Sequence, residues 1–386
     1  MSTMPRPMAD ILVVAGEASG DQHGADVVRA LRAQDPSLRF FGMGGANLKA
    51  AGVELLYGAH EVSVMGIAEV LPRLPRILSV MAGLERAARE RKPALALLVD
   101  IPDFNLRLAA KLKAQGVKVA YYVSPMLWAS REGRVRQVAE RVDEMLCILP
   151  FEEAFYRERG VAARYVGNPV VEQVPAPAPA SQFRAALGVA DVPTLALLPG
   201  SRPSEIRRIL PALVGTARQM VRARPGLQVL VPVAPTVDRA AVAQAFADGG
   251  VKPVLVDGRA PEVVGASDAA VVASGTAALE AGLMERPFVV VYRVSWLTYW
   301  VGRLMLRVAH VALVNLLAKR RVVPELLQGE MTPARICAEL ERLWPDGPDR
   351  ASLLEGLREV RGVLGPPGAA ARAAEAVREL LRSSPR

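Results

Sequence analysis

Short apolar runs recur along this chain, and each is followed by a segment whose apolar residues are spaced as on a helix. The clearest runs span residues 11–15, 94–99, 117–123, 194–198, 269–273 and 288–292. A run without polar alternation predicts a strand that is buried on both faces, as in a parallel sheet. Repeated strand and helix units of this spacing therefore predict an α/β fold built on doubly wound parallel sheets.

The chain has 386 residues, which is longer than most single domains, so two domains are expected. Residues 174–181 alternate proline with small residues, which excludes a helix or a central strand, and we interpret them as part of a linker. We predict two Rossmann-like domains facing each other across a cleft, over residues 1–172 and 173–345. Residues 346–386 are predicted to be helical and to pack back on the first domain, because no strand remains for them to cover.

Composition places the chain among globular proteins, since 51% of its residues are apolar and 23% are charged. The formal charge of +9 suits an anionic partner, but no long basic run occurs, so nucleic acid is the least supported partner. Cys147 and Cys337 form no spaced pair, and His23, His60 and His310 share no ligand spacing, so neither a disulfide nor a metal site is predicted. Without a signal peptide or a run of roughly 18 uncharged apolar residues, the chain is interpreted as cytoplasmic.

The first candidate site follows the apolar run 94–99. Asp100 lies at the carboxyl end of this predicted strand, where open α/β sheets bind ligands. Pro102 stops the strand and stiffens the turn that carries Asp103. A carboxylate here is well placed to take a proton from a substrate hydroxyl, so Asp100 is the candidate general base and Asp103 is the alternative. The competing structural interpretation is that one of these acids only caps the helix starting near Asn105.

A second turn, over residues 16–21, follows the first strand and contains two glycines. Its acids, Glu17 and Asp21, would repel a pyrophosphate, which counts against a dinucleotide and favours a sugar hydroxyl or an acceptor headgroup. Glu17, Ser19 and Asp21 are therefore candidate acceptor-binding residues. The alternative is an ordinary turn in which Ser19 or Asp21 caps the following helix.

Two further loops each lie between a buried strand and a helix start, around residues 200–202 and 274–276. Their backbone N–H groups and Arg202 could hold a diphosphate, while Glu280 could accept both hydroxyls of a ribose. Glu280 is otherwise an ordinary helix carboxylate. The candidate donor-binding residues in these loops are Gly200, Ser201, Arg202, Ser274, Gly275, Thr276 and Glu280. Two such loops opposite an acid are the arrangement expected of a nucleotide-sugar glycosyltransferase, and no Asp-x-Asp metal motif accompanies them.

The combination of motifs resembles the lipid-A-disaccharide synthase family. The residues that carry the resemblance are 16–21, 64–67, 100–105, 122–125, 198–202, 273–280 and 315–318. The resemblance implies a GT-B fold and an inverting, metal-independent transfer without cofactor. In this transfer 2,3-diacylglucosamine passes from its UDP conjugate to 2,3-diacylglucosamine 1-phosphate, giving the β-1,6 disaccharide and UDP. It also implies Asp100 as general base, Arg202 as a functional arginine, Asn315 among the donor residues and Ser124 among the acceptor residues.

Acyl chains on both implied substrates predict that the protein works peripherally at the inner face of the inner membrane, and a homodimer is compatible with the sequence. The favoured lipid contact is the apolar stretch 62–78, which Arg73 and Arg76 interrupt and whose helix Pro72 and Pro75 are expected to break. Its apolar residues are Val62, Val64, Met65, Ile67, Val70, Leu71, Leu74, Ile77 and Leu78. The cluster Trp296, Tyr299 and Trp300, followed by Arg303 and Arg307, is a second candidate for lipid contact, but it directly follows a buried strand and is interpreted rather as part of the core.

Five positions depart from the family pattern, namely Met126, Ser130, Asn168, Val314 and Lys319. They bear on acyl-chain or sugar preference more than on reaction type. Two other functions stay open on the sequence alone. One is an isomerase of the same architecture, similar to UDP-N-acetylglucosamine 2-epimerases, and the other is a nucleotide-binding module without activity.

Overall fold

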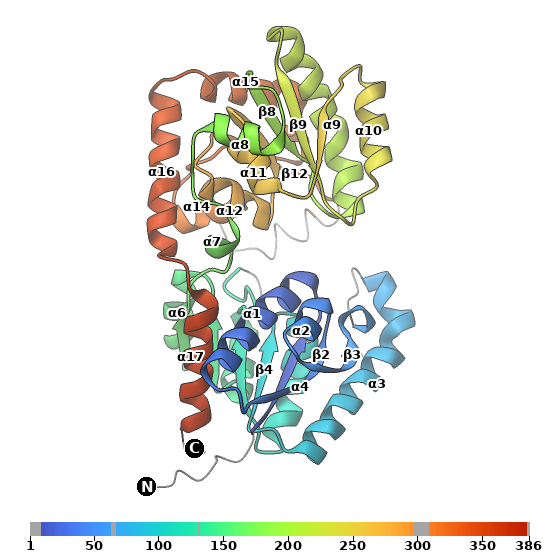
Figure 1. Cartoon of the computed structure of the whole chain (residues 1–386), viewed down its shortest axis with the longest axis vertical. Helices are drawn as coiled ribbons and strands as arrows, with labels where there is room; N and C mark the ends of the chain where they lie inside the picture. The colour runs from blue at the N-terminus through green and yellow to red at the C-terminus, as the bar shows by residue number, and fades with distance from the viewer. Residues whose placement is uncertain (1–8, 63–66, 130–131, 297–298, 300–308, 384–386) are drawn as a thin grey trace. The chain divides into compact units, whose positions relative to one another are not determined.

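The structure is a computed structural model that describes residues 9–62, 67–129, 132–296, 299 and 309–383. The chain divides into two compact units, and it passes between them twice. The first unit comprises Met1–Pro169 and Pro366–Arg386, and the second comprises Val170–Gly365. Each unit contains one parallel sheet with helices packed against it, as the apolar runs predicted (Figure 1).

The sheet of the first unit has seven parallel strands in the order β3-β2-β1-β4-β5-β6-β7. Its strands are β1 (Asp10–Ala15), β2 (Arg39–Gly44), β3 (Glu54–Gly58), β4 (Leu95–Val99), β5 (Lys118–Tyr122), β6 (Glu144–Cys147) and β7 (Ala163–Tyr165). Its helices are α1 (Ala18–Gln34), α2 (Ala46–Ala50), α3 (Ile67–Arg91), α4 (Pro102–Lys113), α5 (Val135–Arg141), α6 (Pro150–Arg157) and α17 (Ala369–Arg382).

Alternate residues of each central strand enter two different cores, one on each face of this sheet. Leu12 of β1 and Leu98 of β4 belong to a core shared with α3, α4, α5 and α6. Val13 and Leu97 belong to a second core, which is shared with α1 and α17. Because the residues on both faces are fully buried, these strands lack the alternation of polar and apolar residues seen in a sheet with one solvent-exposed face. Their sequences are therefore continuous apolar runs.

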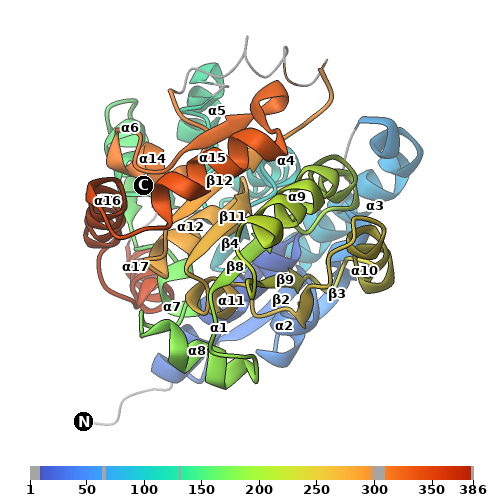
Figure 2. The same cartoon turned by 90° about the horizontal axis from the view of Figure 1, so that it is seen from above.

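The sheet of the second unit has six parallel strands in the order β10-β9-β8-β11-β12-β13. Its strands are β8 (Thr194–Leu198), β9 (Gln228–Val233), β10 (Val254–Asp257), β11 (Ala269–Ala273), β12 (Phe288–Tyr292) and β13 (Glu325–Leu327). Its helices are α7 (Val170–Gln173), α8 (Ala180–Leu187), α9 (Pro203–Ala223), α10 (Arg239–Asp248), α11 (Ala260–Gly265), α12 (Thr276–Leu283), α14 (Leu313–Ala318), α15 (Pro333–Leu343) and α16 (Pro348–Leu364). Figure 2 shows α9 lying beside α15, and these two helices pack together.

The unit boundaries differ from the predicted ones at residues 172 and 346. The first crossing lies between Pro169 and Val170, because α7 packs against α12 of the second unit. Helix α16 also stays in the second unit, where it contacts α12, α14 and α15. Only α17 returns to the first unit, as predicted for the Ala/Arg-rich end of the chain, and it lies beside α1 (Figure 1).

Two expectations about apolar segments were wrong. Helix α3 continues through both Pro72 and Pro75, which lie on an exposed stretch where water can satisfy the carbonyls that lose their partners. Trp296 is 62% exposed and so does not belong to a core, although its ring contacts Tyr299 edge-on. Trp300, Arg303, Arg307, Val64 and Met65 lie outside the described residues.

Within the described part of the chain, no helix combines the length and apolar character needed to cross a membrane.

Candidate functional site

The predicted site loops lie where strand order reverses in each sheet. In the first unit β1 and β4 are neighbours, so the loops that carry Glu17 and Asp100 leave adjacent strand ends. In the second unit β8 and β11 are neighbours, which brings together the loops that begin at Pro199 and Ser274. Such switch points are the usual ligand sites of open parallel sheets. Each unit therefore presents one candidate site.

Asp100 sits on a strained backbone directly after β4. Both Asp100 and Ile101 adopt positive φ angles, 53° and 40°, a region that side chains other than glycine rarely occupy. The Asp100 carbonyl accepts hydrogen bonds from Tyr121 Oη at 2.5 Å and from Asn105 Nδ2 at 2.8 Å. Asn105 is fully buried and also donates to the Val99 carbonyl at 3.1 Å. These contacts hold the strained turn and thereby set the direction of the Asp100 side chain.

The Asp100 carboxylate has the electrostatic environment of a tuned base. Burial raises its pKa from 3.8 to about 6, and the nearby Glu17 carboxylate contributes in the same direction. A base with a pKa close to the working pH is still ionised near neutrality and binds a proton more strongly than an ordinary aspartate. The charge of Glu17 thus acts on Asp100, as expected if the two predicted site residues are neighbours.

Asp103 has a different environment, and neither acid caps the helix. Helix α4 starts at Pro102, three residues before the predicted start, and its N-cap is Ile101 without a side-chain hydrogen bond. The Asp103 side chain is 69% exposed and accepts a hydrogen bond from Arg134 at 2.8 Å. The capping interpretation is therefore wrong for both residues. Asp103 is thus exposed and paired with an arginine, whereas Asp100 is largely buried beside Glu17.

Asp21, a predicted acceptor-binding residue, performs a structural task instead. Its buried carboxylate accepts hydrogen bonds from the backbone N–H groups of Gly45 at 2.6 Å, Asn47 at 2.9 Å and Leu48 at 3.2 Å. It therefore caps α2, a helix that begins 25 residues later in the chain (46 − 21), and not its own helix. Of its neighbours in the turn, Ser19 is exposed and Glu17 is the extended residue before α1.

We expect Asp21→Ala to destabilise the first unit without changing how the acceptor binds. Loss of a carboxylate that caps a helix costs about 1–2 kcal/mol, and here a buried cluster of N–H groups also loses its partner. Chemical denaturation should show a lower free energy of unfolding. The Michaelis constant for the acceptor, measured at a temperature where the variant is folded, should stay unchanged. A rise in this constant at unchanged stability would restore Asp21 to the acceptor site.

Ser124 lies in a loop that is held by a hydrogen bond to a buried acid, Glu152. Ser124 is itself buried, and Trp128 of the same loop donates from Nε1 to Glu152 Oε1 at 3.0 Å. The Glu152 carboxylate also accepts from the Leu149 N–H at 3.1 Å, and burial raises its pKa to about 7. Glu152 was not singled out in the sequence. Its position in an otherwise ordinary helix start offers no signal that it supports a loop.

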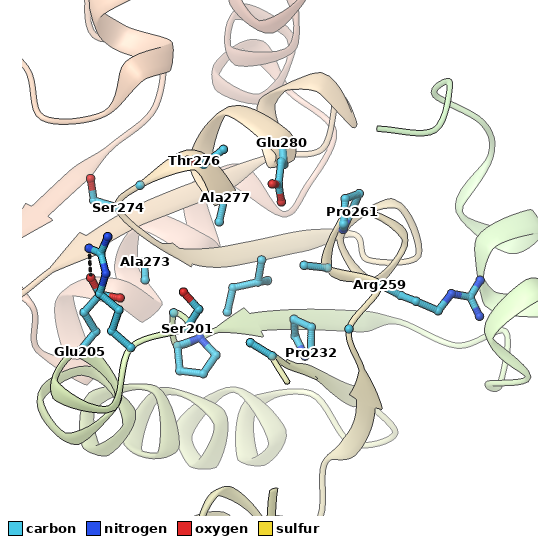
Figure 3. A pocket seen from close by; sticks show the side chains of 18 of the residues that line it. Ser201, Glu205, Pro232, Arg259, Pro261, Ala273, Ser274, Thr276, Ala277 and Glu280 are labelled. Atoms are coloured by element: carbon cyan, nitrogen blue, oxygen red, sulfur yellow. Dashed lines mark hydrogen bonds and ion pairs between the residues drawn. The ribbon is translucent and has the colours of Figure 1, made fainter. Parts of the chain in front are cut away.

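The second unit contains a pocket of about 440 Å³ at the carboxyl ends of β8 and β11. Figure 3 shows its lining, with Ser201, Ser274, Thr276 and Glu280 projecting from the two predicted loops and from α12. The predicted residues that line it are Gly200, Ser201, Arg202, Ser274, Gly275, Thr276 and Glu280. All the donor-binding residues predicted from the two loops thus line a single pocket.

Local geometry makes both loops suitable for an anion. Gly200 and Gly275 have φ angles of 100° and 150°, so a side chain would strain either turn. Helix α12 begins at Thr276 without a side-chain cap on its first N–H groups, whereas α9 begins at Pro203, which has no N–H, directly after Arg202. Glu280, one turn into α12, is half-buried, and burial raises its pKa. The pocket therefore combines helix N-termini, an arginine and an acid that can bind hydroxyls.

Asn315 does not line this pocket. It is fully buried, and its Oδ1 accepts from the N–H groups of Val322 at 2.8 Å and Val323 at 2.9 Å. Its Nδ2 donates to Glu325 Oε1 at 2.7 Å and to the Val323 carbonyl at 2.9 Å. The amide thus holds the chain that leads into β13, which is a structural role and not the predicted contact with the donor.

Three groups of pocket residues were missed by sequence reasoning, and the first comprises Pro232, Ala234 and Pro235 at the end of β9. The loop Gly258-Arg259-Ala260-Pro261, after β10, closes one side of the pocket, and only the strand order shows that it lies there. Glu205, on the first turn of α9, also lines the pocket. Among the described residues, no group of three His, Cys, Asp or Glu side chains is arranged to hold a metal ion. Metal-independent transfer stays a prediction.

The departures from the family pattern fall in different environments. Lys319 ends α14 with a φ of 53°, a left-handed position that favours glycine. Val314 is buried against Gly282, and buried Asn168 donates to the Ile148 carbonyl at 3.0 Å. Met126 is exposed, at 59%, in the Ser124 loop. Ser130 lies outside the described residues.

Comparison with solved structures identifies the architecture. A calicheamicin glycosyltransferase, CalG4, superposes with a TM-score of 0.61 over 98% of this chain and 100% of its own, at 16% identity. A UDP-GlcNAc 2-epimerase from Neisseria meningitidis, solved with UDP-GlcNAc, superposes with a TM-score of 0.60 over 96% of this chain and 99% of its own, at 12% identity. At these identities the likeness concerns the fold alone. Two Rossmann-like units of the GT-B type, as predicted, are confirmed.

Comparison of sequences gives the family. A family profile described as Lipid-A-disaccharide synthetase matches residues 11–351. The lipid-A-disaccharide synthase of Myxococcus xanthus is 68% identical over 382 residues, which cover 99% of each chain. That of Anaeromyxobacter dehalogenans is 55% identical over 380 residues, which cover 98% of this chain and 99% of the relative. This agreement over nearly the whole length also disfavours the epimerase alternative, and the chain belongs to the lipid-A-disaccharide synthase family of glycosyltransferases.

Proposed function

We propose that this chain transfers 2,3-diacylglucosamine from UDP-2,3-diacylglucosamine to 2,3-diacylglucosamine 1-phosphate. The products are the β-1,6 disaccharide 1-phosphate and UDP. The observation that carries the proposal is the pocket of the second unit, which places an arginine and two helix N-termini beside an acid. A diphosphate needs the first three groups, and a ribose needs the acid.

The donor side of the reaction is a stabilisation of departing charge. As the bond between the anomeric carbon and the UDP oxygen breaks, negative charge grows on the diphosphate. Arg202 and the backbone N–H groups of the two loops and of the start of α12 stabilise that charge without a metal ion, because they border the pocket. Ser201, Ser274 and Thr276 supply hydroxyls at the same rim.

The acceptor side needs a proton acceptor, and Asp100 is the group proposed for it. The 6-hydroxyl oxygen bonds to the anomeric carbon from the face opposite UDP, and its proton passes to the Asp100 carboxylate. A pKa of about 6 leaves this carboxylate ionised at neutral pH and able to accept the proton. Attack from the opposite face inverts the anomeric centre. Glu17, Ser19 and Ser124 are the residues proposed to contact the acceptor.

Direct assay of the purified protein tests this function. Incubation with UDP-2,3-diacylglucosamine and the monosaccharide 1-phosphate should give the disaccharide 1-phosphate, detected by mass spectrometry, together with one UDP for each disaccharide. Omission of the acceptor should abolish UDP release. UDP release that continues without acceptor and without disaccharide would contradict transfer and favour hydrolysis or epimerisation.

We also propose that the first unit binds the inner face of the inner membrane through the exposed part of α3. Leu74 and Leu78 are 37% and 50% exposed, and they lie one turn apart on the same side of the helix. Arg73 and Arg76 are exposed beside them, and Arg76 donates from Nε to Glu61 at 2.7 Å. Apolar side chains flanked by arginines suit an anionic lipid surface. Both proposed substrates carry acyl chains, so the enzyme would meet them at the membrane surface.

Replacement of Leu74 and Leu78 by serine should reduce co-sedimentation with anionic liposomes and lower activity on long-chain acceptors. Neither side chain is buried, so the melting temperature should change little. Val363→Ser is a matched control, because Val363 is 46% exposed on α16 of the other unit. A large fall in melting temperature with unchanged liposome binding would show that these leucines stabilise the fold instead.

Homodimer formation stays a separate prediction, to be measured by sedimentation velocity.

A further inference from the structure

One acid inside the donor pocket has no place in the mechanism above. Glu205 lines the pocket from the first turn of α9, and its side chain is only 14% exposed. A side chain added at Gly200 would meet Glu205 Oε2 at 2.9 Å, which places the carboxylate against the same loop that offers its backbone to the anion. A second negative charge at this place would repel a diphosphate.

The Glu205 carboxylate instead engages the arginine on which the pocket depends. Arg202 Nη1 donates to Glu205 Oε1 at 3.1 Å, and the two residues are three positions apart at the start of the helix. A dashed line marks this contact at Glu205 in Figure 3. The Arg202 side chain is otherwise 51% exposed. The guanidinium is therefore held at the pocket by one carboxylate and remains open on its other side.

We infer that Glu205 is a counter-ion that holds the Arg202 side chain at the pocket when no donor is bound. When the donor binds, its diphosphate replaces Glu205 as the partner of Arg202. The inference rests on the proposed function, because it assumes that Arg202 binds the diphosphate. In the free protein the carboxylate keeps the guanidinium at the pocket. When the diphosphate arrives, it competes with Glu205 for the same N–H donors, so part of the binding free energy goes into separating the ion pair.

The consequence is a donor site that binds UDP more weakly than its arginine and helix N-termini would allow. UDP is also the product, and a weaker hold on it favours its release after transfer. The opposite role is a brace, in which Glu205 keeps contact with Arg202 while UDP is bound and so strengthens binding. The two roles predict changes of opposite sign when the charge of Glu205 is removed.

Titration of the full-length protein with UDP by calorimetry distinguishes the two roles. Glu205→Gln keeps the size of the side chain and removes its charge, so UDP should bind about two- to fivefold more tightly, the range expected when a partly exposed ion pair no longer has to be separated. Glu205→Ala should change affinity in the same direction. Unchanged or weaker UDP binding in a folded Glu205→Gln protein would overturn the inference.

Two controls tie the gain to charge at this pocket. Uridine, which lacks phosphate, should bind the wild type and Glu205→Gln equally well, and a similar gain for uridine would contradict a competition for the arginine. Glu339→Gln removes another ion pair that spans three residues, with Arg342 at 3.0 Å, in α15 and away from the pocket. It should leave UDP affinity unchanged.

The Arg202→Ala background separates failure of this inference from failure of the proposed function. With Arg202 absent, Glu205→Gln should improve UDP binding less than about twofold, because the competed group is gone. A full gain in that background would mean that Glu205 acts by repulsion alone, which overturns the inference. If Arg202→Ala itself leaves UDP affinity unchanged, the donor site is misplaced. If it weakens UDP binding but Glu205→Gln does not strengthen it, only the counter-ion role fails.

Discussion

The Asp100→Asn variant should lose about 10²–10⁴-fold in turnover, the usual contribution of a positioned general base, while keeping its fold. Asparagine has nearly the same shape, and it tolerates the positive φ of 53° at this position better than most residues do. The amide cannot take the proton of the acceptor hydroxyl. Turnover is measured as disaccharide formed, and circular dichroism verifies the fold.

Asp103→Asn is the matched control for this variant. Asp103 lies in the same turn but is 69% exposed and paired with Arg134, so its replacement should change turnover far less. A dead Asp103→Asn protein beside a nearly normal Asp100→Asn protein would reverse the two roles.

The pH dependence of the wild type should report the same group. Burial raises the pKa of Asp100 to about 6, so the carboxylate is protonated and inactive as a base below that pH. We expect kcat/KM to rise tenfold per pH unit up to about 6 and to level off above it. A profile that is flat between pH 5 and 7 would show that Asp100 is not the base or has an ordinary pKa in the working enzyme.

Stability should move in the opposite direction to activity. Because the folded pKa of Asp100 lies above its ordinary value of 3.8, stability is lost as the pH rises from about 4 through about 6. A shift of about two units corresponds to roughly 3 kcal/mol at neutral pH. Asp100→Asn removes this cost, so it should unfold at a higher denaturant concentration than the wild type at pH 7 and show no such gain below pH 4.

The Arg202→Ala variant should bind UDP about 10- to 150-fold more weakly, since a hydrogen bond to a charged group contributes about 1.5–3 kcal/mol. The guanidinium lies at the pocket rim with its charge only partly matched by Glu205. Calorimetry with UDP measures the effect. Arg207→Ala is the control, because Arg207 is exposed on the same helix and does not line the pocket.

Glu280→Ala tests the other half of the donor site in the same titrations. If Glu280 binds the ribose hydroxyls, its loss should weaken UDP binding and leave inorganic pyrophosphate binding unchanged, whereas Arg202→Ala should weaken both. Unchanged UDP affinity in both variants would show that the donor binds elsewhere.

The strands, the units and the position of the main loops followed from local pattern. Strands such as β4 and β8 are buried on both faces, so all their residues except Thr194 are apolar, and the apolar run ends where the chain reaches the edge of the sheet. The residues that follow, Asp100 and Gly200, were therefore located without knowledge of their neighbours. Parallel topology then places loops of adjacent strands together, which is how two separate stretches of sequence came to line one pocket.

The partner of each polar side chain was decided by the tertiary structure. Asp21 and Glu17 share one turn, yet Asp21 is directed to the start of α2 while Glu17 acts on Asp100. Asn315 was expected among the donor residues because of the family resemblance, but its amide holds the backbone that leads into β13. Glu205 looks like an ordinary acid in the first turn of a helix until the fold places it in the donor pocket. Hydrophobic periodicity depends on the nearest few residues and is written in the sequence, whereas hydrogen bonds and pKa shifts depend on groups brought together from distant positions, and only the folded chain determines those.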